Sequence, residues 1–153
     1  MKQLFIREFK SIDTTSAVDL YISVFSQAPW NDELFKADIE LYFQRLQSMN
    51  TFIGYVLLDV NTEELLGVSL GFIRPWYGGE QYHMDSFYVS FEYQGQGLGS
   101  FFLGGIKKEL SAINMPHIFL DTERGFPAEE FYRKNNFTSL DDSISLVCEI
   151  TKP

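Results

Sequence analysis

The residues from Tyr93 to Ser100, YQGQGLGS, have the composition of a loop that binds phosphate groups. Gly95, Gly97 and Gly99 alternate with other residues, and an apolar run follows them. Glycine adopts positive φ angles and lets a ligand approach the main chain closely, at an entropic cost on folding. At the start of a helix, such a loop directs several N–H groups at one point, where the helix dipole adds partial positive charge. The stretch therefore predicts a phosphate or pyrophosphate site, and the alternative is a tight turn with no ligand.

Two other phosphate-binding motifs fit this loop less well. The P-loop sequence GxxxxGK[ST] is absent from the chain. The dinucleotide motif GxGxxG fits at Gly95 and Gly97 but has Ser100 in place of its third glycine. That motif normally lies in a βαβ unit, whereas this loop follows three consecutive predicted strands. A nucleotide or NAD binder is therefore the weaker interpretation.

The segment before the loop, QYHMDSFYVS, contains two side chains suited to proton transfer. In a β-strand, His83, Asp85, Phe87 and Val89 would share one face, because side chains alternate with a period of two. Histidine titrates near neutral pH and therefore suits proton removal. Asp85 could remove a proton through water or bind a substrate ammonium. A charge among apolar neighbours is costly unless it is paired, which favours such a role over that of a random carboxylate. The alternatives are an aspartate held by strand amides and a histidine packed under a loop.

The elements that must position these residues follow from the apolar periodicity. Steps of three and four predict a first helix with Asp13 or Thr14 as N-cap, ended by Pro29, and a second helix that starts near Asp32. Branched and aromatic runs predict most of the strands. The other predicted elements are an edge strand at 2–9, meander strands at 51–60, 65–77 and 81–90, a helix at 98–114, a strand at 117–122, a helix at 127–136 and a closing strand at 144–150.

The sequence predicts three further details of these elements. HIFLDT, at 117–122, is nearly all apolar, as expected for a strand buried on both faces. Pro127 suits the first turn of the last helix. The residues expected to face the core are Phe35, Ile39, Tyr42, Leu46 and Met49 in the second helix and Leu103, Ile106, Leu110 and Ile113 in the third. The chain is thus expected to be one mixed α/β domain over residues 1–153, with the order β-α-α-β-β-β-α-β-α-β.

One pattern fits the glycine loop completely: Gln94-x-x-Gly97-x-Gly99. Here the sequence resembles the GNAT superfamily of N-acetyltransferases, whose signature Gln/Arg-x-x-Gly-x-Gly/Ala lies between the fourth strand and the third helix. The resemblance spans nearly the whole chain: MDSFYVSFEYQGQGLGSFFL resembles the family's core, IFLDT its fifth strand and PAEEFYRKNNF a later conserved helix. Two sites depart from the family pattern. Asn136 stands where the family usually has glycine, and Arg124-Gly125 where it often has asparagine.

The resemblance implies the GNAT fold and acetyl-CoA as the co-substrate. The loop amides would hold the cofactor pyrophosphate, with Gln94 facing the phosphates. The main chain of Tyr88 and Val89 would hydrogen-bond the pantetheine arm, as an added β-strand does. The implied cofactor site is Tyr88, Val89, Gln94, Gly95, Gln96, Gly97, Leu98, Gly99 and Ser100.

The resemblance also implies catalytic residues and an acceptor wall. Tyr132 matches a helix tyrosine that in many members lies near the CoA sulfur, and a phenol protonated at pH 7 can give its proton to a departing thiolate. Family members with a side-chain base often carry it where Asp85 and His83 stand, while many use only ordered water. The segment APWNDE would form one wall of the acceptor pocket. There Trp30 offers a face for a cation, and Asp32 and Glu33 could recognise an amine or, alternatively, favour a helix N-terminus.

Composition restricts the class of protein further. Hydrophobic residues make up 45% of the chain and charged residues 22%, as in soluble globular proteins, and the formal net charge is −9. An acidic chain does not suit nucleic-acid binding, which needs a basic face. The first residues lack a long apolar core, no apolar run is long enough for a membrane span, and no metal-ligand spacing occurs. We therefore expect a cytoplasmic protein without a signal peptide, a membrane span or a metal. The lone Cys148, in the last predicted strand, is expected to be a core residue.

The sequence therefore predicts an enzyme that transfers an acetyl group from acetyl-CoA to a primary amine. The acceptor would be a small cationic molecule or an exposed amino group, and the resemblance implies that its amine attacks acetyl-CoA directly, without an acyl-enzyme. The alternative is a GNAT-fold module that binds acyl-CoA without turnover, because the base is unassigned. The high aromatic content, 16%, leaves room for a homodimer interface.

Overall fold

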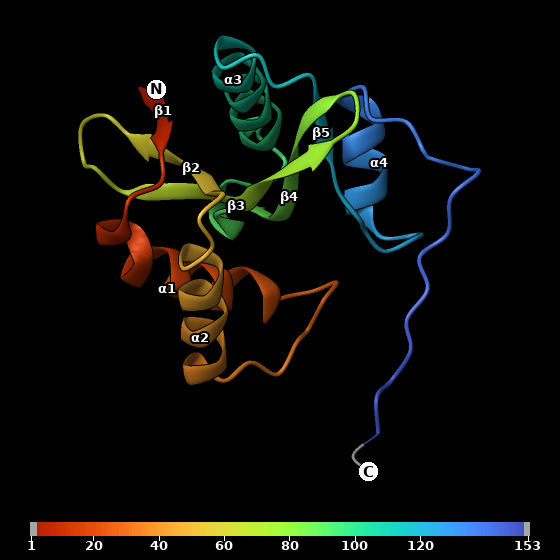
Figure 1. Ribbon diagram of the computed structural model, residues 1–153. Helices are drawn as coiled ribbons and strands as arrows, with labels where there is room; N and C mark the ends of the chain where they lie inside the picture. Colours follow the sequence, from red (N-terminus) through yellow and green to blue (C-terminus); the bar gives the residue numbers. More distant parts are fainter. Residues whose placement is uncertain (1–2, 152–153) are drawn as a thin grey trace. The chain divides into compact units, whose positions relative to one another are not determined.

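The computed structural model describes residues 3–151, which form two compact units, one ending at Asp121 and one beginning at Thr122. The first unit contains the sheet, three α-helices and two short 3-10 helices (Figure 1). Its elements are β1 (Leu4–Glu8), η1 (Ser11–Asp13), α1 (Thr14–Phe25), α2 (Lys36–Gln47), β2 (Phe52–Asp59), β3 (Leu65–Trp76), β4 (Gly79–Val89), η2 (Phe91–Tyr93), α3 (Leu98–Ala112) and β5 (His117–Phe119). The second unit contains α4 (Pro127–Lys134).

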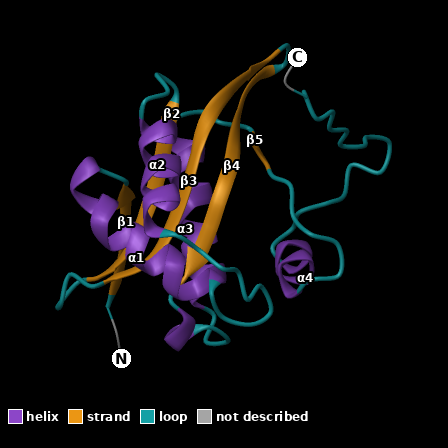
Figure 2. Cartoon of the chain, turned by 90° about the horizontal axis from the view of Figure 1, so that it is seen from below, coloured by secondary structure: helices purple, strands orange, loops and turns teal. Residues whose placement is uncertain are grey.

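The sheet has the strand order β1-β2-β3-β4-β5. The pairs from β1 to β4 are antiparallel, and β5 pairs in parallel with β4. The meander of three strands and the edge position of β1 are as expected from the sequence. In the first unit, α1 and α2 cover one face of the sheet and α3 covers the other (Figures 1 and 2). β2 is buried along most of its length because both of its faces are covered.

Two cores lie against the two faces of the sheet. On the α1/α2 face, Phe43 and Val18 are fully buried and pack in one cluster with Val56, Val68 and Tyr88. On the α3 face, Phe102 stacks on Phe87, with ring centroids 5.3 Å apart. Leu103, Ile106 and Leu110 of α3 are buried, as their spacing predicted, but Ile113 is 49% exposed. The helix ends at Ala112, so Ile113 follows it as the C-cap and turns outward.

The two glycines inside α3 differ in their surroundings. A Cβ at Gly105 would overlap the Ile6 side chain of β1, so glycine is what lets the helix lie this close to the sheet edge. A Cβ at Gly104 would have no heavy atom within 4 Å. Only Gly105 therefore has a packing role.

The second helix begins later than its sequence indicated. α2 starts at Lys36 rather than near Asp32. Asn31 has a positive φ of 50°, and Phe35, the N-cap, has extended backbone angles, so the helix cannot extend back through these residues. Phe35 and Met49, expected to face the core, are 64% and 38% exposed because they lie outside the helix.

The second unit is built around the helix α4. Pro127 opens α4 at its first turn, as predicted. The helix carries two ion pairs at i,i+4, Arg133–Glu129 and Lys134–Glu130. Asn136 follows the helix with a φ of 70°, and the Phe137 N–H donates to the Tyr132 carbonyl at 3.0 Å. Asparagine thus takes the left-handed position that glycine usually fills, as expected.

The closing strand was predicted wrongly, and the fifth strand, although present, is shorter and less buried than predicted. Residues 143–151 contain no helix or strand, and Ile144, Leu146, Val147 and Ile150 are each at least 79% exposed. Cys148 is exposed as well, so it is not a core residue. β5 pairs over three residues only and is not buried on both faces. A branched apolar run becomes a strand only where another strand accepts its hydrogen bonds, and 144–150 has none among the described residues.

Candidate active site

The glycine loop has the conformation that its composition predicted. Gly95 and Gly97 have φ angles of 81° and 78°, and Gly97 is the N-cap of α3. A Cβ on either residue would meet no atom within 4 Å, so these glycines are needed for their backbone angles and not for space. The first intrahelical bond runs from the Phe101 N–H to the Gly97 carbonyl at 3.0 Å. The N–H groups of the first helical turn have no carbonyl partner within the helix and are suited to an anion.

The strand before the loop has one partly unpaired edge. β4 pairs with β5 only from Gln81 to His83, and no other strand among the described residues pairs with that side between His83 and Val89. Just after β4, the Ser90 N–H donates to the carbonyl of Leu66 in β3, at 2.7 Å. Because main-chain groups alternate in direction along a strand, those of Tyr88 also point to β3 and those of Val89 point to the unpaired edge. The Gln94 side chain supports this direction for Val89, because its Nε2 donates to the Val89 carbonyl oxygen at 3.4 Å.

A β-bulge in β4 centres on Asp85. Leu70 pairs with Ser86 and the next residue of β3, Gly71, pairs with Met84, so Asp85 has no partner residue in β3. A Cβ at Gly71 would overlap the His83 carbonyl oxygen. The bulge therefore depends on glycine at position 71, and it inserts one extra residue into the alternation of β4.

The bulge overturns the prediction that His83, Asp85, Phe87 and Val89 share a face. Phe87 stacks on Phe102 of α3, whereas His83 stacks on Phe72, which packs against the α1/α2 core. His83 and Phe87 therefore lie on opposite faces of the sheet. The period of two holds on each side of the bulge and changes phase at Asp85.

The Asp85 carboxylate is held by one hydrogen bond from α2. The Tyr42 hydroxyl donates to Asp85 Oδ2 at 2.6 Å and lies 2.6 Å from the Ser86 hydroxyl. Burial, and then the hydrogen bond to Asp85, raises the pKa of Tyr42, so its hydroxyl stays protonated at physiological pH. Within residues 3–151, no lysine, arginine or histidine forms an ion pair with Asp85.

The Tyr42 ring, whose hydroxyl holds this carboxylate, belongs to a series of aromatic contacts on the α1/α2 side. The Tyr21 ring lies 6.1 Å from that of Tyr42 and 4.6 Å from that of Phe25, which contacts Trp30 at 5.0 Å. Burial raises the pKa of Tyr21 first, and the charges of Asp32 and Asp85 raise it further. Trp30, from the predicted acceptor wall, is thus linked to Tyr42 through Phe25 and Tyr21. Asp32, from the same wall, is exposed and acts on Tyr21 through its charge. Glu33 is exposed.

His83 is less accessible than Asp85. Its ring lies between those of Phe72 and Phe119, with centroids 4.7 Å and 5.2 Å away. Its Nδ1 is buried and has no hydrogen-bond partner among the described residues. A buried N–H without a partner is costly, so the tautomer with hydrogen on Nε2 is favoured. That tautomer leaves the accessible nitrogen without a lone pair for accepting a proton, which favours Asp85 over His83 as the base.

Tyr132 belongs to the second unit. Its ring packs between Phe131 and Phe137, with centroids 5.3 Å and 5.2 Å away. Burial raises the pKa of Tyr132, which makes it a weaker acid than a free tyrosine but keeps it protonated.

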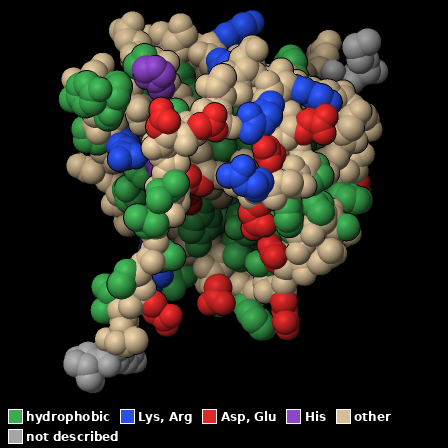
Figure 3. All heavy atoms as spheres, turned by 90° about the vertical axis from the view of Figure 1, so that its right-hand side faces the viewer, with side chains coloured by type: hydrophobic (Ala, Val, Ile, Leu, Met, Phe, Trp, Pro, Cys, Tyr) green, Lys and Arg blue, Asp and Glu red, His purple; other side chains and the backbone are tan. Residues whose placement is uncertain are grey.

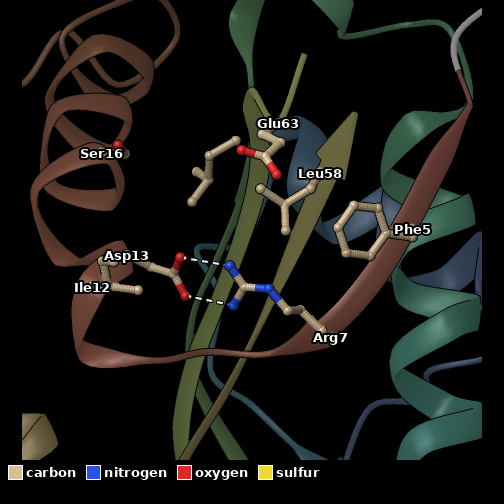
Figure 4. Close-up of a pocket in the computed structure, with 8 residues that line it drawn as sticks. Phe5, Arg7, Ile12, Asp13, Ser16, Leu58 and Glu63 are labelled. Carbon is tan, nitrogen blue, oxygen red and sulfur yellow. Dashed lines mark hydrogen bonds and ion pairs between the residues drawn. The ribbon is translucent and has the colours of Figure 1, made fainter. Parts of the chain in front are cut away.

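A separate pocket lies between β1 and the start of α1 (Figure 4). Arg7 and Asp13 face each other across it and form two hydrogen bonds of 2.8 Å. Asp13 also accepts from the Lys10 N–H, so this N-cap residue of α1 uses its carboxylate to connect β1 with η1. The pocket's two central charges are thus paired with each other, which indicates a structural role.

Sequence reasoning missed Tyr42 as a site residue. Its spacing with Ile39 and Leu46 placed it on the apolar face of the second helix, and that placement was correct. Its hydroxyl was the signal that it had a polar partner, because buried tyrosine hydroxyls usually make a hydrogen bond. The partner, Asp85, could not be inferred without knowing the bulge.

No metal-binding group and no membrane-crossing helix occur in the described part of the chain. Residues 3–151 contain no cluster of three or more histidine, cysteine or acidic side chains able to hold a metal ion. None of their helices is both long enough and apolar enough to cross a bilayer.

Known structures share this fold at low sequence identity. An aminoglycoside acetyltransferase from an uncultured soil metagenomic sample, crystallised with trehalose, superposes with a TM-score of 0.72 at 18% identity over 97% of both chains. A possible acetyltransferase from Clostridium difficile 630 gives 0.80 at 16% identity, over 97% of this chain and 99% of that one. Glucosamine-6-phosphate N-acetyltransferase from Arabidopsis thaliana gives 0.67 at 14%, over 98% and 100%.

Family membership follows from a sequence model. No curated protein sequence matches the chain. The model of the acetyltransferase (GNAT) family, however, matches residues 7–137, which include the glycine loop, Asp85 and Tyr132. The chain therefore belongs to the GNAT family and is an acetyl-CoA-dependent acyltransferase.

Proposed function

We propose that this acyltransferase acetylates a primary amine of a cationic acceptor, which is a small molecule or an exposed amino group. The observation that carries the proposal is the Asp85 carboxylate, which has no cationic partner among residues 3–151. It stands on β4 beside the unpaired strand edge. A carboxylate without a counter-ion, bonded to the hydroxyl of an aromatic side chain, suits an ammonium group.

The cofactor site combines the glycine loop with the unpaired edge of β4. The amides from Gln94 to Ser100 hold the pyrophosphate at the start of α3, where the helix dipole favours negative charge. The main chain of Val89, directed to the unpaired edge, hydrogen-bonds the pantetheine arm. Tyr88 contributes less, because its main chain faces β3 and its hydroxyl donates to the buried Ala17 carbonyl at 2.6 Å.

The reaction is a direct attack by the amine on the thioester. Asp85, directly or through a water, binds the ammonium and takes one proton from it, which frees the nitrogen lone pair. The nitrogen attacks the carbonyl carbon, the C–S bond breaks, and the nitrogen loses a second proton to solvent. Tyr132 gives a proton to the departing thiolate and regains one from solvent. His83 is the second candidate for the base.

The nature of the acceptor is suggested by the acidic and aromatic residues of the predicted acceptor wall. Trp30 offers a ring, and Asp32 and Glu33, both exposed, offer two further carboxylates. An acceptor with more than one amino group fits such a site. The aminoglycoside acetyltransferase of the same fold, which has also been crystallised with sisomicin (TM-score 0.73, 16% identity, 97% of both chains), supports testing this class first.

Thermal melting with acetyl-CoA, CoA or NAD, followed by thiol release, tests the proposal. A ligand at about 100 times its Kd stabilises the folded state by about 2.7 kcal/mol, or several degrees. We expect a shift with both CoA forms and none with NAD. We then expect thiol release with at least one of sisomicin, spermidine, glucosamine 6-phosphate or a lysine peptide. The Asp85→Asn variant should keep the melting shift and lose at least tenfold in kcat/KM for the amine. A melting shift with no thiol release from any amine would instead favour a non-catalytic acyl-CoA sensor.

A further inference from the structure

The hydroxyl of Tyr42 fixes the direction in which the Asp85 carboxylate points. We propose that Tyr42 is a positioning residue for acetyl transfer, acting through Asp85 on the acceptor amine. The inference rests on the proposed function, because it takes Asp85 as the group that binds the ammonium. Tyr42 lies on α2, 43 residues before Asp85, so the fold alone brings the two together.

The protons of this group can be assigned by counting donors. An ionised carboxylate only accepts, so the Tyr42 hydroxyl uses its one hydrogen on Asp85 Oδ2. The contact between Tyr42 and Ser86 must then run the other way, from the Ser86 hydroxyl to the Tyr42 oxygen. The result is a directed chain, Ser86 to Tyr42 to Asp85. Each donor orients the next, and the last one is charge-assisted.

The hydrogen-bond chain leaves one oxygen of the Asp85 carboxylate open. Asp85 Oδ1 accepts no hydrogen bond from residues 3–151, whereas Oδ2 is occupied by Tyr42. Asp85 is an exposed side chain at a bulge, where no paired residue of β3 restricts its rotamers. The Tyr42 ring is restricted by contacts with the rings of Tyr21 and Phe43, whose centroids lie 6.1 Å and 5.7 Å from its own. A fixed ring therefore holds an otherwise mobile carboxylate, with Oδ1 directed to the acceptor.

The bulge is what makes this arrangement possible. It places Asp85 and Ser86, which are adjacent in sequence, within reach of the same hydroxyl. In a regular strand, neighbours point to opposite faces and could not both contact Tyr42. The network and the bulge thus form one local structure.

The test compares Tyr42→Phe with a matched variant, Tyr82→Phe. Tyr42→Phe removes one hydroxyl and keeps the ring. Tyr82→Phe also removes a hydroxyl bonded to a serine, that of Ser69 at 2.7 Å, but on the α3 face of the same sheet. With the best amine of the panel as probe, Tyr42→Phe should lower kcat/KM about tenfold, the effect of one charge-assisted hydrogen bond, with an unchanged KM for acetyl-CoA. Tyr82→Phe should lower the melting temperature and leave kcat/KM within twofold.

Two further measurements separate the inference from the proposed function. In an Asp85→Asn background, Tyr42→Phe should cost less than about twofold, because coupled residues are non-additive. Equal losses in both backgrounds would mean a structural role and overturn the inference. Crystal structures give a test that needs no acceptor: Asp85 should occupy several rotamers in Tyr42→Phe and one in Tyr82→Phe. A single unchanged rotamer in Tyr42→Phe would overturn the inference alone, whereas failure of Asp85→Asn to affect any amine would overturn the role of Asp85 in the proposed function and the inference with it.

Discussion

At the scale of single residues, the candidate site depends on which polar groups are already partnered. The hydroxyls of Tyr82 and Tyr88 are buried and bonded inside the fold, to Ser69 and to the Ala17 carbonyl. Asp85 keeps one oxygen open to an incoming ammonium. Sequence reasoning identified Asp85 because a charge in an apolar strand needs a partner. It favoured Asp85 over His83 for a role in the site but left the base open between Asp85, His83 and water, because that choice depends on the buried Nδ1 and on the rings stacked against His83.

The general acid is tested by Tyr132→Phe. If Tyr132 protonates the departing thiolate, kcat for the amine should fall by about 100-fold, at the lower end of general acid effects. The KM for acetyl-CoA should stay unchanged, since the ring that packs on Phe131 and Phe137 is retained. Tyr77→Phe is the control, because Tyr77 is 93% exposed at the β3–β4 turn. Steady-state thiol release measures both variants, and a kcat for Tyr132→Phe within twofold of the unmodified chain would exclude the role.

At the scale of elements, the helices and the central meander could be predicted, whereas features set by long-range partners could not. Periodicity located α1, α3 and α4 because each buries an apolar stripe or begins at a recognisable cap or proline. The bulge in β4 depends on Gly71 in another strand, and no local pattern around Asp85 indicates it. The run at 144–150 has the composition of a strand, but composition does not specify a pairing partner.

The glycines of α3 allow a matched test of helix packing. Gly105→Ala should destabilise the fold by about 1–3 kcal/mol, because the added Cβ overlaps Ile6 of β1. Gly104→Ala should stabilise it by up to about 1 kcal/mol, because alanine is the better helix former and has space there. Urea unfolding followed by circular dichroism measures both. Equal effects of the two substitutions would show that α3 does not approach β1 as closely as described.

The Arg7–Asp13 pair predicts a pH dependence of stability. Burial alone would raise the pKa of Asp13, but the hydrogen bonds from Arg7 and from the Lys10 N–H outweigh it and hold the pKa below its ordinary value of 3.8. A lowered folded-state pKa means that the unfolded chain binds the proton first as the pH falls. The stabilisation is therefore complete above about pH 5 and is lost progressively below about pH 4.

Asp13→Asn isolates this contribution. At pH 7 the variant should be less stable by about 1–3 kcal/mol, because Arg7 loses its charged acceptor. The difference between the two proteins should shrink as the pH falls from 5 to 3. Urea midpoints at each pH measure it, and a difference that stays constant over this range would mean that Asp13 is not held ionised by Arg7.

At the scale of the whole molecule, the net charge of −9 acts on both substrates. Acidic and basic side chains are interspersed on the face seen in Figure 3, so the field arises from the excess of acidic residues over the whole chain rather than from one patch on that face. Such a field attracts a cationic acceptor and repels acetyl-CoA, which is an anion. The cofactor therefore has to be bound through local contacts, such as the amides of the glycine loop, against the long-range field.

Ionic strength should then change the two KM values in opposite directions. Raising the salt from about 0.01 M to 0.15 M shortens the Debye length from about 30 Å to 8 Å, which screens the distant charges. The KM for a polyamine acceptor should rise severalfold and that for acetyl-CoA should fall, with kcat unchanged. Asp85→Asn removes only one of the charges that produce the field, so it should raise the acceptor KM at every salt concentration without flattening the dependence. If the salt dependence disappeared in Asp85→Asn, the attraction would be local to Asp85, and the charge of the whole chain would have no part in bringing the acceptor to the site.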